Sequence, residues 1–192
     1  MKSKNSIYKI CLAALAVCIN LVGGELALLL RLPIYLDSIG TILVGALCGP
    51  WYGLLPGLLS GILLGITSDI YSLYFAPVGM IVGMMTGLIW KKLLTKRSPK
   101  WRIFPAALII TVPGTIVSSL ICAKLFGGIT SSGSTILVQL LAKTPLGLTA
   151  SVFIVQILTD YLDRLISIIL VMALLKALPK HLLATFQEKG GQ

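Results

Sequence analysis

Polar side chains that could do chemistry are few in this sequence, and most of them interrupt apolar stretches. The chain has six Asp and Glu residues and one histidine, His181, which follows the last apolar stretch. A serine hydrolase acting within a membrane would therefore lack its histidine base. The sequence has no HExxH motif, no phosphate-binding P-loop and no His/Cys/Asp/Glu cluster with metal-ligand spacing. It predicts a protein without enzyme activity, metal or cofactor.

The remaining polar residues gather near one end of the apolar stretches, where they could bind a small molecule. A polar group inside an apolar membrane segment is costly, so it indicates a function or a buried partner. We therefore expect a binding pocket at this end rather than a continuous conduction path. The candidate substrate-binding residues are Asn20, Glu25, Arg31, Tyr35, Asp37, Asp69, Tyr71, Tyr74, Lys124, Gln139, Gln156 and Asp160.

Some of these candidates also have a simpler structural explanation, which the sequence leaves open. Glu25 is either a functional carboxylate or an interfacial one that reaches water. Asp37 is either a ligand contact or a cap, because Asp is favoured at a helix N-terminus. Tyr71 and Tyr74 are either pocket walls or members of an aromatic belt at the membrane surface.

The composition places these residues in a membrane protein. The 192 residues are 57% hydrophobic and 11% charged, and the mean hydropathy is +0.99. Such values are typical of integral membrane proteins. The length fits a single domain, residues 1–192, with about six spans of ~20 residues. The expected fold is an all-α integral membrane protein, a compact six-helix bundle with spans at 7–30, 36–47, 52–66, 74–90, 104–125 and 151–178.

The positive charge is distributed unevenly along the chain. The net charge is +10, and Lys and Arg cluster before the first span, between the fourth and fifth spans and after the last span. The positive-inside rule assigns such segments to the cytoplasm, so both termini are expected there. The charges are expected to meet anionic lipid, and nucleic acid is not an expected partner.

Glycine recurs at every fourth position from Gly45 to Gly65, and the spacing returns from Gly79 to Gly87. In a soluble helix each interior glycine costs ~1 kcal/mol relative to alanine. In lipid, small residues at this spacing let two helix backbones approach closely. The pattern predicts tightly packed helices, with a turn at residues 48–51 where Pro50 interrupts the repeat.

Two features of the second half of the chain could shape a site. Segment 126–149 is rich in Gly and Ser, so it is the candidate lid over an outward-facing pocket. The alternative is an ordinary loop with a short amphipathic helix at 135–141. In the last span, Asp160 and Arg164 are four residues apart and can pair, and we expect a structural ion pair between Arg164 and one Asp.

Two segments of the chain resemble a known family. The stretch LPIYLDSIGTILVGALCGPWYGLLPGLLSGILLG and the ending DRLISIILVMALLKALPK are similar to the substrate-binding S components of energy-coupling factor (ECF) transporters. Together with the length and the basic loop, the resemblance covers essentially the whole chain. It implies a multi-pass protein of a prokaryotic plasma membrane. Such a protein would capture a water-soluble vitamin or related micronutrient outside, a pyridoxine-like or pyrimidine-like compound first and a nucleoside next.

The resemblance also implies partners. Members of this family associate with a membrane scaffold protein, EcfT, and with two ATPases. The small-residue face of the first span corresponds to the family's contact motif, so the candidate EcfT contacts are Leu12, Ala14, Ala16 and Cys18. A different class of function stays open: a membrane sensory or scaffold module whose output is a separate protein.

Overall fold

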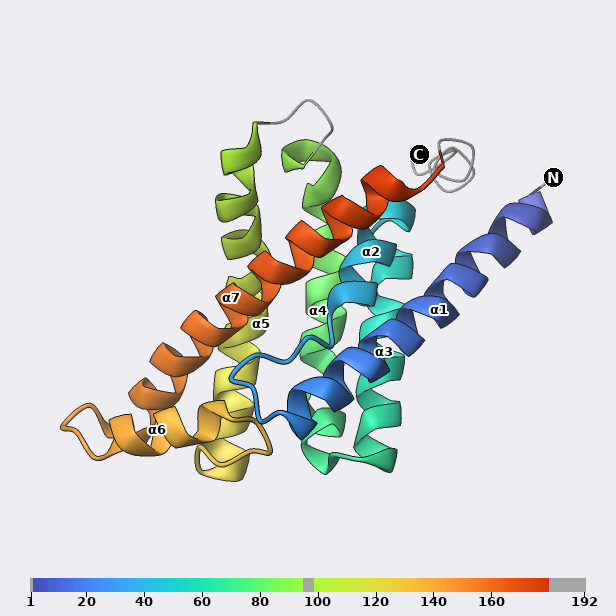
Figure 1. Ribbon diagram of the computed structural model, residues 1–192. Coiled ribbons are helices and arrows are strands. Elements are labelled where there is room, and N and C mark those ends of the chain that lie inside the picture. The colour runs from blue at the N-terminus through green and yellow to red at the C-terminus, as the bar shows by residue number, and fades with distance from the viewer. Residues whose placement is uncertain (1, 95–98, 180–192) are drawn as a thin grey trace.

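The computed structural model describes residues 2–94 and 99–179, which are helical apart from short connections (Figure 1). No strand occurs in these ranges. The described residues do not include some of the basic residues considered above, namely Lys96, Arg97, Lys180, His181 and Lys189. The helices are α1 Lys2–Leu29, α2 Ile39–Cys48, α3 Pro50–Thr67, α4 Ile70–Leu93, the short 3-10 helix η1 Lys100–Arg102, α5 Ile103–Phe126, α6 Ser134–Ala142 and α7 Gly147–Ala177.

Each predicted span overlaps one helix, although some boundaries were wrong. Helix α4 begins at Ile70, earlier than expected, because the Asp69 carboxylate caps it by accepting a hydrogen bond from the Tyr71 backbone N–H. Helix α2 begins later than expected, at Ile39, after Leu36 has taken a positive φ of 54°. Its N-cap is Ser38, so the structure does not support a capping role for Asp37. The short helix predicted at 135–141 is confirmed as α6.

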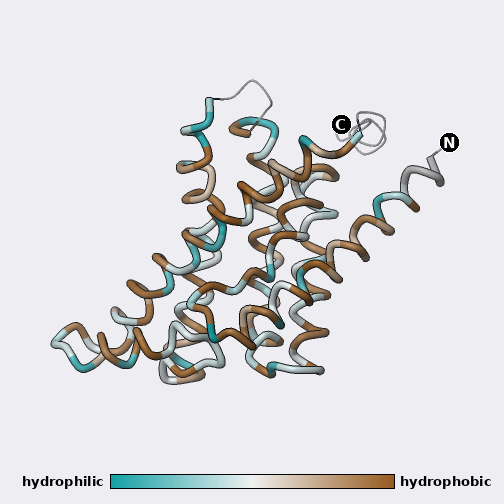
Figure 2. The backbone as a smooth tube through the Cα atoms, viewed as in Figure 1, coloured by the Kyte–Doolittle hydropathy of each residue, from teal (hydrophilic) through white to brown (hydrophobic). Residues whose placement is uncertain are grey.

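In the part of the chain that the structure describes, four helical stretches are long and apolar enough to cross a membrane: Ser6–Leu29, Pro50–Thr67, Ile70–Leu93 and Lys100–Phe126. Hydrophobic residues run along these helices (Figure 2). Large apolar side chains also remain on the outside, with Leu15, Ile66 and Leu158 being 57%, 73% and 61% exposed. Lipid contacts a surface of this kind. The described part of the chain is therefore an all-α bundle compatible with a membrane.

The remaining two candidate spans differ from these four. Helix α2 has only 10 residues, and α7 has 31 but carries Asp160, Asp163 and Arg164 near its middle. Helix α2 lies between α1, α3, α4 and α7, and all of its residues except Ile39 are buried. An apolar helix without a polar face is stable in such a central place.

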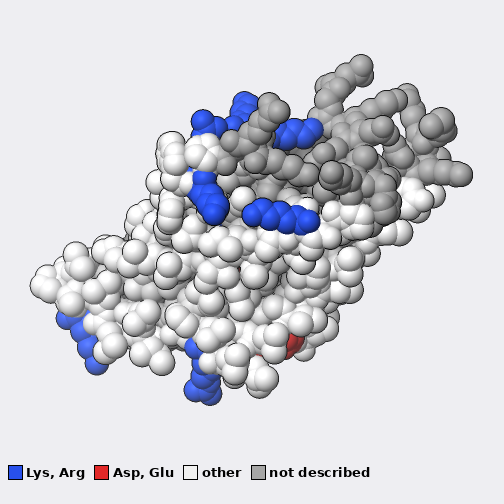
Figure 3. All heavy atoms as spheres, turned by 45° about the horizontal axis from the view of Figure 1, so that its top comes forward, with Lys and Arg blue, Asp and Glu red and all other residues white. Residues whose placement is uncertain are grey.

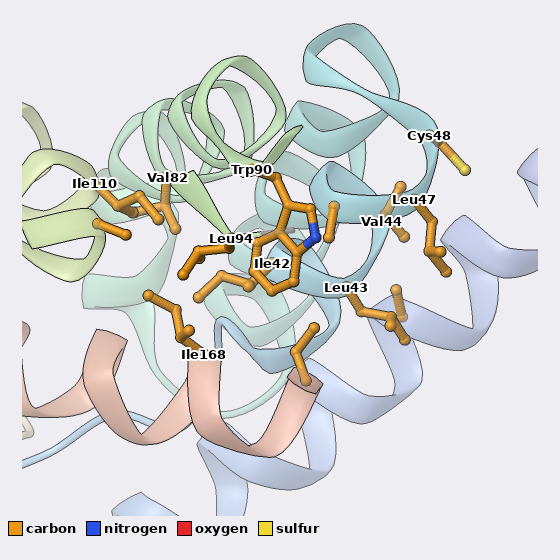
Figure 4. Close-up of a cluster of buried hydrophobic side chains, with 14 of the residues drawn as sticks. Ile42, Leu43, Val44, Leu47, Cys48, Val82, Trp90, Leu94, Ile110 and Ile168 are labelled. Atoms are coloured by element: carbon orange, nitrogen blue, oxygen red, sulfur yellow. The ribbon is translucent and has the colours of Figure 1, made fainter. Parts of the chain in front are cut away.

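The apolar core surrounds the second half of α2. Ile42 of α2, Trp90 of α4 and Ile168 of α7 belong to one cluster of buried side chains (Figure 4). This cluster lies toward the end of the bundle at which α4 ends and α5 begins. A second, smaller apolar cluster lies in the opposite half of the bundle and contains Cys122, Val138, Val152 and Val155.

Basic side chains gather around the end of the bundle where α4 ends and α5 begins (Figure 3). Lys91 and Lys92 are exposed in the last turn of α4, and Lys100 is exposed in η1. Trp51 and Trp101, at the starts of α3 and η1, are 73% and 64% exposed. Exposed tryptophans beside basic residues are typical of a membrane–water interface.

The repeated glycines form the contact between α3 and α4, which are the most closely packed pair of helices. Gly57 lies against Gly79, and a Cβ added to Gly57 would come within 2.3 Å of the Gly79 carbonyl carbon. Gly53 meets Gly83 in the same way, with a Cβ on Gly83 reaching within 2.0 Å of the Gly53 oxygen. The two backbones therefore touch directly, as the spacing predicts.

The turn between α2 and α3 also forms where it was predicted. Gly49 has a φ of 88°, which an L side chain rarely adopts, and Pro50 takes the first position of α3. The chain can therefore reverse within one residue and bring α2 and α3 into the same layer.

Candidate binding cavity

A cavity lies in the half of the bundle away from the basic end. The volume open to the centres of water molecules is about 90 Å³. One water needs roughly 10–15 Å³ by this measure, so the cavity can hold several waters or one small organic molecule. Its wall comes from α1, loop 30–38, α2, α3, α4, α5, loop 127–133 and α7. The polar residues of the wall are Tyr35, Asp37, Ser38, Thr41, Ser60, Asp69, Tyr71, Ser72, Ser118, Thr130, Ser131, Ser132, Gln156, Asp160 and Arg164.

The structure brings part of the predicted binding set together in this wall. The residues that line it are Tyr35, Asp37, Asp69, Tyr71, Gln156 and Asp160. Those that do not line it are Asn20, Glu25, Arg31, Tyr74, Lys124 and Gln139. The second group has other contacts or faces the surface.

Asn20 holds three helices together instead of lining the cavity. Its side chain is fully buried, and its Nδ2 donates to Thr41 Oγ1 at 2.8 Å and to Ser60 Oγ at 3.2 Å. Its Oδ1 accepts a hydrogen bond from the Gly40 backbone N–H at 2.8 Å. That N–H is in the first turn of α2 and has no partner within the helix. Asn20 of α1 therefore caps α2 from outside and joins it to α3.

The other residues outside the wall lie at the same end of the bundle. Glu25 is exposed and accepts a hydrogen bond from Ser68, which follows α3. Tyr74 packs edge-on against Phe126, with ring centroids 5.2 Å apart. Arg31 and Lys124 are exposed, and Gln139 is half-buried on α6.

Asp163 fixes loop 30–38, which forms one side of the cavity. Its side chain is fully buried and accepts hydrogen bonds from the backbone N–H of Tyr35 at 3.2 Å and of Leu36 at 2.7 Å. Ser38 Oγ donates to its other oxygen at 3.1 Å. Backbone N–H groups outside regular helices need partners of this kind when they are partly withdrawn from water.

Arg164 forms the ion pair expected for the last span, but its partner is the adjacent Asp163 rather than Asp160. Its guanidinium Nη1 also donates to Ser38 Oγ. The Nε atom is buried and has no hydrogen-bond partner among the described residues. Since Arg164 lines the cavity, this donor is a group that a bound molecule could satisfy.

Hydroxyl groups of α5 support the polar residues of α7. Thr115 Oγ1 donates to Asp160 Oδ2 at 2.7 Å, and Ser119 Oγ donates to Gln156 Oε1 at 2.9 Å. Both acceptors are more than nine-tenths buried. The sequence analysis missed these hydroxyls, although 111, 115, 118 and 119 share one helix face by their spacing.

Aromatic rings and loop 127–133 border the cavity at the end of the bundle. Tyr71 packs edge-on against Phe126, with centroids 4.8 Å apart. The backbone at Gly133 lies against Arg31, where an added Cβ would come within 2.1 Å of the carbonyl oxygen. Loop 127–133 therefore packs against loop 30–38, and its residues Thr130, Ser131 and Ser132 line the cavity. The part of the predicted lid that reaches the cavity is this short loop, whereas α6 packs on α7.

The predicted partner face of α1 is partly exposed. Ala14 and Cys18 lie on the surface, and Leu12 is half-buried. Ala16 is fully buried, because its backbone packs against Gly40 of α2. A partner could thus reach Ala14 and Cys18 directly, but not Ala16 in this arrangement.

Comparison of the chain with protein-family models, with curated proteins and with solved structures found no match.

Proposed function

We propose that this chain is the substrate-capture subunit of an ECF-type importer in a prokaryotic plasma membrane. It binds a water-soluble vitamin or related micronutrient from outside and delivers it inward with EcfT and two ATPases. All six long or central helices serve as spans in this proposal, and both termini are cytoplasmic. The observation that carries it is the polar cavity, which lies away from the basic end of the bundle.

Three features support this proposal. The cavity is of a size for one small molecule, and it combines carboxylates, an arginine, an amide and aromatic rings. The basic end is the one that the positive-inside rule assigns to the cytoplasm, which puts the cavity on the outer side. Ala14 and Cys18 offer a small-residue surface on α1, where another membrane helix could pack closely.

Enlarging the α1 surface is expected to separate assembly from ligand binding. Ala14→Trp and Cys18→Trp should reduce recovery of the complex with EcfT and ATPases, and hence uptake, by about tenfold or more, because a bulky ring prevents close helix approach. Ligand retention by the isolated chain, measured by native mass spectrometry, should stay unchanged. Gln156→Ala should do the reverse, weakening ligand retention while the complex still forms.

The control is Leu108→Trp, which enlarges an apolar side chain of α5 that is already 49% exposed. It should leave assembly, uptake and ligand retention intact. Normal uptake by both α1 variants would contradict the proposed contact face. If the chain is instead recovered with a kinase or other output protein and never with ATPase subunits, the sensory or scaffold alternative is correct.

A further inference from the structure

The charges around the cavity do not balance. Asp37 comes from loop 30–38, and Asp160, Asp163 and Arg164 come from α7. Asp163 and Arg164 form an ion pair. Asp37 and Asp160 form no ion pair of their own, and one cationic side chain of the wall, Arg164, serves three carboxylates. The N-terminus of α2 adds only about half a positive charge, so the wall stays negative.

Both carboxylates have unused hydrogen-bonding capacity. Asp160 is 6% exposed, and its Oδ2 accepts hydrogen bonds from Thr115 at 2.7 Å and from Ser118 at 3.4 Å. No hydrogen bond between described residues reaches its Oδ1, and none from another side chain reaches the carboxylate of Asp37. On the same wall, Arg164 Nε is buried without an acceptor. Among the charged groups of the wall, two acceptors and one donor therefore have capacity left for a ligand.

Unpaired charge in such a place favours a ligand of opposite sign. A buried carboxylate loses hydration, so it stays ionised only beside a cation or several donors and otherwise takes up a proton. A neutral ligand would leave the two carboxylates to be protonated, and an anionic one would add repulsion, whereas a cation compensates their charge directly. A metal ion is a poor match, since the described residues hold no group of three His, Cys, Asp or Glu that could bind one.

We propose that the molecule captured in this cavity is a small organic cation with hydrogens on its charged nitrogen. The cation lies between Asp37 and Asp160, and one oxygen or nitrogen acceptor of the ligand receives a hydrogen bond from Arg164 Nε. Tyr71 and Phe75 also line the cavity, and aromatic rings of this kind attract organic cations. This assignment rests on the proposed capture function and narrows its substrate class.

Three probe molecules of similar shape test which ligand charge the cavity prefers. They are benzamidine, benzamide and benzoate, which carry a positive, zero and negative charge at neutral pH. Binding to the purified full chain in detergent is measured by calorimetry and by the thermal unfolding midpoint. We expect benzamidine to bind about tenfold or more tightly than benzamide, as a charge-assisted hydrogen bond allows, and benzoate not to bind.

Variants connect the preference to the two carboxylates. Asp160→Asn and Asp37→Asn each keep the side-chain shape and should reduce the preference for benzamidine over benzamide by about tenfold. Glu25→Gln is the matched control, because it removes an exposed carboxylate at the same end of the bundle but outside the cavity wall. It should bind the three probes as the unmodified chain does.

The outcomes separate this assignment from the capture function. If benzamide or benzoate binds as tightly as benzamidine, or if an anionic or neutral compound co-purifies in the cavity, the cation assignment is wrong and the capture function stands. If none of the probes binds and native mass spectra find no small molecule on the chain, both are wrong. Equal loss of benzamidine binding in Glu25→Gln would also overturn the placement between Asp37 and Asp160.

Discussion

Replacing Gly57 by alanine is expected to destabilise the protein by about 3 kcal/mol. The added Cβ would lie within 2.3 Å of both the carbonyl carbon and the oxygen of Gly79. These are backbone atoms of a helix, so they cannot turn aside as a side chain would, and α3 and α4 must separate along their length. The thermal unfolding midpoint in detergent and the yield of monodisperse protein measure the effect.

Gly114→Ala is the matched control for this substitution. Gly114 is also a buried glycine inside a helix, but the nearest atoms to its added Cβ are Val78 Cγ1 at 3.4 Å and Val82 Cγ2 at 3.7 Å. These are ordinary contacts, so the variant should be unchanged or more stable by up to ~1 kcal/mol from helix propensity. Equal stability of Gly57→Ala and Gly114→Ala would contradict the backbone contact between α3 and α4.

Replacing Asp163 by alanine is expected to cost about 3–5 kcal/mol of stability, because it leaves the buried Arg164 charge without its partner. The change also removes the acceptor for two backbone N–H groups, those of Tyr35 and Leu36. Loop 30–38 should then lose its position beside the cavity. Unfolding in increasing denaturant measures the stability, and hydrogen exchange at residues 35–38 measures the order of the loop.

Two further variants separate the charge from the hydrogen bonds. Asp163→Asn keeps an oxygen acceptor for the loop and loses only the charge, so its loop should exchange more slowly than in Asp163→Ala. The double variant Asp163→Ala with Arg164→Met removes both charges and should recover part of the lost stability. If the double variant is less stable than Asp163→Ala alone, the ion pair is not the reason for the loss.

The helices and the closest helix contact could be predicted from the sequence. Glycine at every fourth position has one physical use in an apolar helix, which is to let another backbone approach, and Gly53 and Gly57 do this. The turn at Gly49 and Pro50 was also predictable, because glycine adopts a positive φ that other residues avoid and proline favours the first turn of a helix. The start of α4 was not predicted, because Asp69 was interpreted as a candidate substrate-binding residue and not as a helix cap.

The cavity could be predicted only in part. Sequence position indicates that a polar residue lies near one end of a span, but not which way its side chain points. Asn20 and Asp160 look alike by this criterion, yet one caps α2 and the other lines the cavity. Spacing within α7 favoured a pair between Asp160 and Arg164. The fold brings loop 30–38 against α7. Asp163 accepts a hydrogen bond from the loop backbone and also forms the ion pair with Arg164.

The glycines that join α3 and α4 also line the cavity, since Gly57, Gly61 and Gly79 belong to its wall. A captured molecule would therefore touch bare main chain on this side. A mutation that added even a methyl group here would have two effects, because it would narrow the cavity and also push the two helices apart. In the proposed function, a change of cargo would therefore have to arise on the facing wall, in loop 30–38, loop 127–133 and α7.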